Sequence, residues 1–257
     1  MSRLAGLIAA WVALPVLAAV EGPGVDQFIQ ATRTTEMIRA DGKLDEPAWQ
    51  QAPVFDAFVQ TFPNANAAPS ERTQMRVLYD ERNVYFGFYL HDSQPENIIR
   101  TLGRRDQPPD SDAIQVVIDS AHDHRTGYVF KVTAGGVQAD SLLFQDNKET
   151  QEWDAVWDGA ASMAPDGWTA EIVIPLQILR YPAAPVQTWG FAAQRTIARN
   201  HEENLSVFIP PNASGKVSRL GHLTGLKELQ DPRHLELTSY LAARSVLRPQ
   251  FCGPAHL

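Results

Sequence analysis

Two tryptophans, Trp153 and Trp157, stand four residues apart beside the polar segment 145–152. Indole rings offer flat apolar faces on which a ring-shaped ligand can stack, and polar side chains at the edge of such a platform can bind the ligand's polar groups. Candidates for that edge occur before and after the pair: Arg104, Arg105, Arg195, Asp112, Asp140 and Glu171. These residue types predict a binding platform with a charged rim.

Each of these residues also has a structural explanation. The two tryptophans suit the core of a folded domain equally well. Asp140 and Glu171 interrupt apolar runs, so wherever they are buried they need a partner such as Arg195. A network of structural ion pairs therefore accounts for the rim residues as well as ligand contact does. Three further tryptophans lie in strongly patterned segments and are predicted to be core residues: Trp49, Trp168 and Trp189.

Short β-strands are the elements that must position these side chains. Residues 71–80 and 84–92 are two β-rich runs about a polar turn, which is typical of a hairpin. Six further runs are separated by turn residues: 113–119, 127–133, 137–144, 155–163, 167–174 and 188–198. This pattern predicts an all-β fold, an antiparallel β-sandwich with one or two short helices, of which residues 175–180 are a candidate.

The segment 38–49, here called the knot, combines a tight turn, clustered acids and a tryptophan. Gly42 follows Asp41, and such a pair favours a turn because glycine accepts a positive φ. Asp45 is a candidate helix N-cap, and Pro47 suits the first helical turn because it lacks an N–H. We expect a strand, a turn and one helical turn that buries Trp49.

Residues 1–19 have the pattern of a secretion signal, with Arg3 before an apolar run at 4–17 and small residues at its end. The run is interrupted by Pro15 and is short for a membrane span, although an anchor is the alternative. We therefore expect export, to a periplasm or beyond the cell. Residues 20–34 are interpreted as a polar lead-in, and residues 231–257 as the truncated start of a following domain or an irregular tail.

The composition limits the classes of partner. A formal net charge of −8 argues against nucleic acid or anionic lipid as the main ligand. Cys252 is the one cysteine, so no intramolecular disulfide can form and the core must stabilise the fold alone.

The knot resembles the start of the carbohydrate-binding module family 9-like domain. Further short motifs follow in the family's order over about residues 35–230: Asp112 to Asp119, Tyr128-x-Phe130 before Gly135-Gly136, Trp153-Asp154 with Trp157, Gly167-Trp168 to Pro175, and Trp189-Gly190-Phe191 with Arg195. Each motif is short, and the ordered series is specific. The chain most resembles the branch in which this domain precedes an outer-membrane β-barrel, which is absent from this sequence.

This resemblance implies a jelly-roll-like sandwich that binds a polysaccharide or oligosaccharide and is associated with carbohydrate breakdown. On this basis Trp153 and Trp157 are the predicted sugar platform, with four charged residues as its contacts: Arg104, Arg195, Asp140 and Glu171. The resemblance also implies a possible structural calcium ion, for which Asp106, Asp110 and Asp112 could supply oxygen ligands, although no twelve-residue calcium loop is present. We interpret the sequence from His122 to His124 as a solvated turn rather than a transition-metal site.

A secreted, non-catalytic carbohydrate-binding module is our first hypothesis, and three alternatives stay open. The chain could be a periplasmic interaction or plug domain of a truncated outer-membrane barrel protein, without sugar affinity. It could be a glycoside hydrolase, but no signature marks the two opposed carboxylates that this chemistry needs, and no Gly-x-Ser-x-Gly motif occurs. Similar sandwiches bind haem, for which the ligand candidates would be Met75, Met163 and His91.

Overall fold

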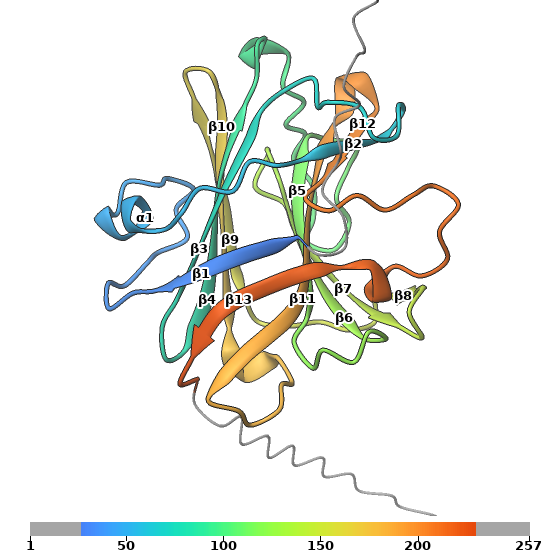
Figure 1. Cartoon of the computed structure of the whole chain (residues 1–257). Coiled ribbons are helices and arrows are strands. Elements are labelled where there is room, and N and C mark those ends of the chain that lie inside the picture. The colour runs from blue at the N-terminus through green and yellow to red at the C-terminus, as the bar shows by residue number, and fades with distance from the viewer. Residues whose placement is uncertain (1–26, 230–257) are drawn as a thin grey trace, which may run out of the picture.

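The computed structural model describes residues 27–229, which form one continuous, curled mixed sheet whose two halves face each other (Figure 1). The first half, called sheet A, has the spatial order β8 (Lys148–Thr150), β7 (Gln138–Phe144), β6 (Gly127–Thr133), β5 (Ala113–Asp119), β11 (Val186–Ile197) and β13 (Gly221–Lys227). At its margin β12 (Glu202–Leu205) pairs with β11 and with β2 (Val59–Phe62).

The second half, called sheet B, has the order β1 (Phe28–Arg33), β3 (Thr73–Tyr79), β4 (Asn83–His91), β10 (Gly167–Pro175) and β9 (Asp158–Ala164). Strand β1 joins the halves, because it pairs in parallel with β13 on one side and with β3 on the other. Every other strand pair among residues 27–229 is antiparallel.

Helices are few and short in the described part of the chain. The α-helix α1 spans Pro47–Gln51, and the 3-10 turns are η1 (Pro95–Asn97), η2 (Leu176–Ile178), η3 (Ala198–Asn200) and η4 (Val217–Arg219). No helix within residues 27–229 is long and apolar enough to cross a membrane.

The main core lies between the two halves of the sheet. Alternate residues of each strand point inward, so side chains of sheet A meet those of sheet B. The rings of Phe86 on β4 and Phe191 on β11 stack with centroids 5.2 Å apart. Trp168 and Trp189 are fully buried in this core, as the sequence predicts.

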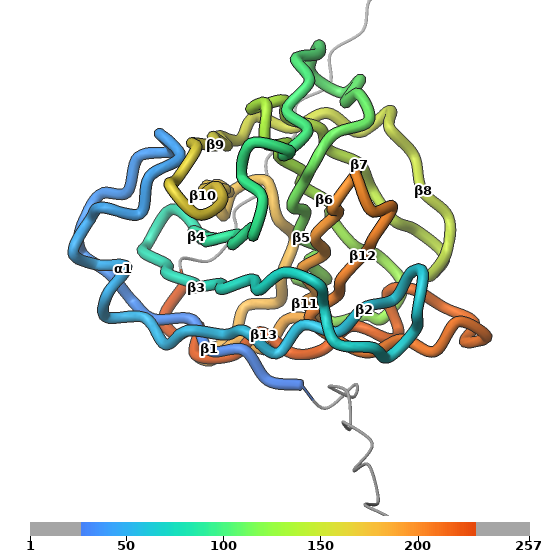
Figure 2. Tube along the Cα trace, turned by 90° about the horizontal axis from the view of Figure 1, so that it is seen from above, coloured from blue at the N-terminus to red at the C-terminus, as the bar shows by residue number. Residues whose placement is uncertain are grey.

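The outer face of each half is covered by a second, smaller core. On sheet B the knot places Trp49 against Leu78, Tyr85 and Val173. Gly87 lies beneath it, and a side chain there would meet the indole, since an added Cβ would be 2.8 Å from Trp49 Cζ3. The knot and α1 lie on the side of the molecule opposite β8 (Figure 2).

On sheet A the segment 206–220, called the cover loop, has the same role. Val207, Val217 and Leu220 from this loop pack on Val117 and Val129 of the sheet. Each outer face is therefore buried in part beneath its covering segment, and the rest of the sheet beside that segment stays accessible to solvent.

The predicted all-β sandwich is confirmed, and the 71–92 hairpin forms as β3 and β4. The predicted strand at 155–163 begins later, at Asp158. Helix α1 is capped at Glu46 rather than Asp45, without a side-chain hydrogen bond. The segment 175–180 contains the 3-10 turn η2.

The boundaries of the folded unit differ from the prediction. Residues 28–33, interpreted as part of a polar lead-in, form β1, which pairs along both edges and buries Ile29 and Ala31 in the main core. Strand β12 lies in the segment 200–218, where the sequence predicts no strand. The predicted signal at 1–19 and the tail at 231–257 lie outside the described residues.

Candidate functional site

The predicted tryptophan platform lies largely inside the molecule. Trp157 is 3% exposed, and its Nε1 donates a hydrogen bond to Asp140 Oδ1 over 2.9 Å. Its ring meets Phe130 edge-on, and Trp153 is half-buried against Tyr128 and Phe130. Trp157 therefore has no free face for a ligand in this conformation, and only part of Trp153 is accessible.

Asp140 belongs to the same buried network. Its carboxylate accepts hydrogen bonds from Ala155 N at 3.0 Å and from Arg105 at 2.9 Å. The Arg105 guanidinium also lies 5.5 Å from the Trp157 ring centroid, in cation–π geometry. Asp140 thus has its hydrogen bonds satisfied within the protein. Arg104, on the neighbouring loop, is exposed.

Glu171 anchors the knot rather than a ligand. It is fully buried, and its Oε2 accepts hydrogen bonds from Asp41 N and Gly42 N, each at 3.0 Å. Its Oε1 accepts one from Trp49 Nε1 at 3.2 Å. Burial raises the pKa of Glu171 to about 7, against which these hydrogen bonds act. Arg195, expected as its partner, is not among its contacts, since backbone N–H groups of the knot satisfy the carboxylate.

Arg195 fastens the two halves of the sheet together. It is fully buried on β11, and it donates to Arg72 O at 3.0 Å and to His91 O at 2.7 Å, at the start of β3 and the end of β4. Burial lowers its pKa to about 10, although nearby acids such as Asp112 oppose the shift. Arg195 is therefore structural in this conformation.

The three aspartates predicted to bind calcium are not brought together. Asp112 is fully buried, and its Oδ1 accepts a hydrogen bond from Ala198 N at 3.1 Å. Burial raises its pKa. Asp110 is exposed on the preceding loop. The expected oxygen cluster does not form, because Asp112 points into the interior beside η3.

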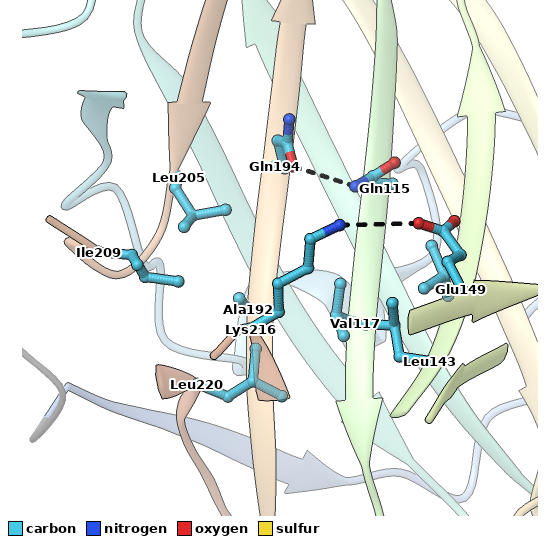
Figure 3. A pocket seen from close by; sticks show the side chains of 11 residues that line it. Gln115, Val117, Leu143, Glu149, Ala192, Gln194, Leu205, Ile209, Lys216 and Leu220 are labelled. Atoms are coloured by element: carbon cyan, nitrogen blue, oxygen red, sulfur yellow. Dashed lines mark hydrogen bonds and ion pairs between the residues drawn. The ribbon is translucent and has the colours of Figure 1, made fainter. Parts of the chain in front are cut away.

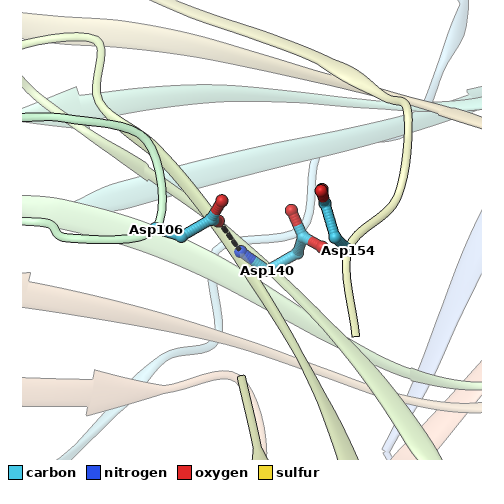
Figure 4. A group of neighbouring side chains, drawn as sticks. All are labelled: Asp106, Asp140 and Asp154. Atoms are coloured by element: carbon cyan, nitrogen blue, oxygen red, sulfur yellow. Dashed lines mark hydrogen bonds between the residues drawn. The ribbon is translucent and has the colours of Figure 1, made fainter. Parts of the chain in front are cut away.

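Another group of carboxylates does form, from Asp106, Asp140 and Asp154, with one oxygen of each within 4.8 Å of the others (Figure 4). Asp106 Oδ1 accepts a hydrogen bond from Asp140 N at 3.2 Å. Arg105 binds Asp140 and lies 3.6 Å from Asp106 Oδ2, so its guanidinium already supplies positive charge to the group. The arrangement fits an ion-pair network better than a calcium site.

The candidate haem ligands do not converge. Met75 is fully buried in the main core, whereas Met163 is exposed on β9. The His91 imidazole lies within hydrogen-bond distance of Asp166 and Gln74, at 3.2 Å from each. Met75 therefore lies apart from the other two candidates, and both ring nitrogens of His91 have protein partners.

A pocket of about 190 Å³ opens on the outer face of sheet A beside the cover loop (Figure 3). Its floor consists of aliphatic side chains from four neighbouring strands, β11, β5, β6 and β7. Its wall comes from β12 and the cover loop. The apolar lining residues are Val117, Val129, Leu143, Ala192, Leu205, Ile209 and Leu220. Such a floor is a continuous apolar surface, because alternate side chains of neighbouring strands point to the same face of the sheet.

Two glutamines at one end of this pocket supply its planar polar groups. Gln115 on β5 and Gln194 on β11 are paired in register, and Gln115 Nε2 donates to Gln194 Oε1 over 3.0 Å. Lys131 on β6 continues the row. Across the mouth, Lys216 Nζ and Glu149 Oε2 lie 3.8 Å apart, both substantially exposed. We call this site the sheet A pocket.

Sequence reasoning missed both glutamines. The alternation of β5 and β11 places each on the face opposite the main core. Their adjacency follows from the pairing of strands whose glutamines are 79 positions apart, which no local pattern reveals.

The sheet A pocket joins an apolar floor to planar amides, which is the combination of groups that small-molecule sites use. The family of the protein is given by sequence: the chain belongs to the carbohydrate family 9 binding domain-like family, whose profile matches residues 40–207. No curated protein sequence matches the chain.

Solved structures with the same fold include a family 9 carbohydrate-binding module from Caldicellulosiruptor kristjanssonii in complex with cellotriose. It is 15% identical, with a TM-score of 0.52, and the match covers 83% of this chain and 100% of that one. A glucose complex of a family 9 module from the same organism has 14% identity and a TM-score of 0.55, with coverages of 80% and 98%.

A protein from Bacteroides uniformis, provisionally described as carbohydrate-binding, is 9% identical and has a TM-score of 0.60. The match covers 77% of this chain and 98% of that one. At these identities the likeness concerns the fold.

Proposed function

We propose that this protein is a non-catalytic carbohydrate-binding module that takes one sugar ring into the sheet A pocket. The observation that carries the proposal is the Gln115–Gln194 amide pair above an apolar floor. Amides can donate to and accept from sugar hydroxyls, while the C–H face of a pyranose can pack on Val117 and Ala192.

The size of the pocket supports a single ring rather than a chain. Its volume of about 190 Å³ is below the roughly 300–1,000 Å³ of sites for drug-sized ligands. A terminal sugar residue, with the rest of the chain extending past Lys216 and Glu149 into solvent, fits this limit. The family 9 modules with the same fold were solved with glucose and with cellotriose, which agrees with a ligand of this class.

Calorimetric titration with glucose and cellotriose tests the proposal. The Gln194→Ala variant should lose affinity about fivefold to tenfold, since it removes one hydrogen-bonding amide and leaves Gln115 without its partner. Gln151→Ala is the matched control, because Gln151 is exposed away from the pocket lining. Unchanged affinity in both Gln194→Ala and Gln115→Ala would exclude the sheet A pocket.

The same titration separates this pocket from the predicted tryptophan platform. Trp153 is half-buried, and a sugar that stacked there would be lost with Trp153→Ala while Gln194→Ala still bound it. The opposite pattern supports the sheet A pocket. Circular dichroism spectra of both variants report whether the fold is retained.

We also propose that the protein is exported and acts in the periplasm or outside the cell, in association with carbohydrate breakdown. The support is the signal-like pattern of residues 1–19. Expression of the full chain in a bacterial host, followed by N-terminal sequencing of the exported fraction, should give a start near residue 20. A chain retained in the cytoplasm with Met1 or Ser2 first would contradict export.

A further inference from the structure

A wider groove of about 550 Å³ lies on the outer face of sheet B, between the knot and the turn that joins β9 to β10. Its floor is one row of residues in register across four strands: Gln74, Tyr89, Thr169 and Ser162. Residues of the knot and α1 line one wall, and residues 163–165 line the other. We call this site the sheet B groove.

Tyr89 gives the groove an aromatic surface that is held in place. Its hydroxyl donates a short hydrogen bond to Asp166, and its ring centroid lies 4.5 Å from that of His91. The hydrogen bond to Asp166 raises the pKa of Tyr89 to about 12, because it stabilises the protonated phenol as the donor. Gln74 Oε1 lies 3.2 Å from His91 Nε2, which orients the Gln74 amide group.

Arg76 is the feature of the groove that the fold leaves unsatisfied. It is half-buried on β3, and its Nε is buried without a hydrogen-bond partner. Within residues 27–229 neither Arg76 nor Lys43, which also lines the groove, forms an ion pair. Asp45 is the one acid among the lining residues.

An unpaired, half-buried cation is costly, because it loses hydration without gaining a partner. The residues that line the groove include two cations, Arg76 and Lys43, and one acid, in a chain whose formal net charge is −8, and the nearby Asp166 carboxylate is engaged by Tyr89 and His91. In the row across the sheet Arg76 is followed by Gly87, over which Trp49 and Leu44 pack, and then by Glu171. The Glu171 carboxylate is already bonded to the knot, and no ion pair joins it to Arg76. A bound anion would complete the hydrogen bonding of Arg76.

We propose that the sheet B groove is a second saccharide site, which takes a sugar that carries a carboxylate, such as a uronic acid residue of an acidic polysaccharide. The planar guanidinium of Arg76 matches a carboxylate, with Lys43 adding charge. Gln74 and Gln50 can bind hydroxyls, and the Tyr89 ring offers its face to the C–H side of the sugar. The saccharide class rests on the proposed function, and the acidic preference rests on Arg76.

Two sites on opposite outer faces would let one molecule hold two glycan segments. Because the second contact then forms at high effective concentration, even two weak sites would retain the protein on a polysaccharide. The sheet A pocket would supply the contact to a neutral ring and the sheet B groove the contact to an acidic one.

Titration with a uronic acid disaccharide and, separately, with cellotriose tests the inference at low salt. The uronic acid ligand should bind, and Arg76→Gln should weaken its binding about tenfold or more, as expected for loss of a charged hydrogen bond. Lys43→Gln, at an exposed position, should weaken it about twofold to threefold. Arg82→Gln, which removes an exposed arginine outside the groove, should have no effect.

The outcomes separate this inference from the proposed function. Absence of uronic acid binding, equal binding by the wild type, Arg76→Gln and Lys43→Gln proteins, or loss of binding in Gln194→Ala alone would overturn the sheet B groove as the acidic site. Cellotriose binding that depends on Gln194 tests the sheet A pocket independently. Raising the ionic strength should weaken uronic acid binding in the wild type and have little effect on cellotriose.

Discussion

The two outer faces of the sandwich are covered in the same way, and one carboxylate holds each cover in place. On sheet B, Glu171 accepts hydrogen bonds from Asp41 N, Gly42 N and Trp49 Nε1 of the knot. On sheet A, Asp146 accepts hydrogen bonds from the cover loop, two of them from Ser218 N at 2.9 Å and Ser218 Oγ at 2.8 Å.

The environments of these carboxylates are opposite, and so are their pKa values. Burial raises the pKa of Glu171 to about 7, despite its hydrogen bonds. Desolvation is the largest single influence on Asp146 and would raise its pKa, but hydrogen bonds from Ser218, Lys216 and Val217 together outweigh it and lower the pKa. The stability that each carboxylate contributes by holding its covering segment therefore changes with pH in opposite directions, depending on the balance between desolvation and hydrogen bonding.

The largest effect on stability is expected from removal of Trp49, the side chain that anchors the knot on sheet B. Trp49→Ala should reduce the free energy of unfolding by about 3–5 kcal/mol, because it removes a fully buried indole from a small core and frees the Glu171 carboxylate. Urea denaturation followed by circular dichroism measures this loss. A loss below about 1 kcal/mol would mean that the knot is not needed to stabilise sheet B.

The pH dependence of the knot should be the second effect. In the folded protein the pKa of Glu171 is raised from 4.5 to about 7. The contribution of Glu171 to the free energy of unfolding is therefore fully present below pH 4.5 and is lost as the pH rises through about 7. The loss should amount to about 2–3 kcal/mol. Thermal melts of the wild type and Glu171→Gln between these pH values test this. The wild-type Tm should fall across the range, and the variant should respond much less.

On the other face, Leu220→Ala should cost about 2 kcal/mol, towards the lower limit for a buried leucine, because the site borders an open pocket that can relax. The variant should also weaken glucose binding, since Leu220 lines the sheet A pocket. Denaturation and calorimetry on the same sample measure both effects. A loss as large as that of Trp49→Ala would contradict the difference between the two covers.

Asp146 should affect the stability of the protein at acidic pH. Its lowered pKa means that its stabilisation is present at neutral pH and is lost as the pH falls below the ordinary aspartate value of about 3.9. Asp146→Asn should therefore flatten the acid limb of the stability curve and leave the neutral limb, assigned to Glu171, unchanged. An altered neutral limb would show that the two covers are coupled.

The smallest effect should come from the ion pair at the mouth of the sheet A pocket. Lys216 and Glu149 are 3.8 Å apart and well exposed, so Glu149→Gln should change stability by less than about 0.5 kcal/mol. Thermal melts at low and high salt should show the same small difference. A larger change would mean that this pair holds the cover loop to β8.

Local patterns in the sequence predicted most strands, and long-range pairing decided the rest. The 71–92 hairpin and β10 follow from alternation within one segment. The knot's turn and buried Trp49 were predictable for the same reason, but Glu171, 122 positions from Trp49, was not recognisable as its partner. Strand β1 was not predicted, because its alternation is short, with Ile29 and Ala31 as its buried residues, and its partner β13 lies at the other end of the described chain.

The candidate site was predictable only as a class. The sequence predicted flat apolar surfaces with polar neighbours, but it assigned them to Trp153 and Trp157, and Trp157 lies inside the molecule. Tryptophan is a strong signal for stacking and an equally strong signal for packing, and only the sheet order distinguishes the two. The Gln115–Gln194 pair carries no local signal, because either residue alone is an ordinary half-exposed strand position.

The parallel pairing of β1 with β13 also has a mechanical consequence. Since Phe28 lies opposite His222 and Gln30 opposite Thr224, the chain enters this pair at one end and leaves it at the other. A pulling force applied between Gln27 and Leu229 would load all the hydrogen bonds between the two strands together, in shear, rather than opening them one by one. A terminal pair loaded in this way resists extension between these two residues more than a pair whose hydrogen bonds open one at a time.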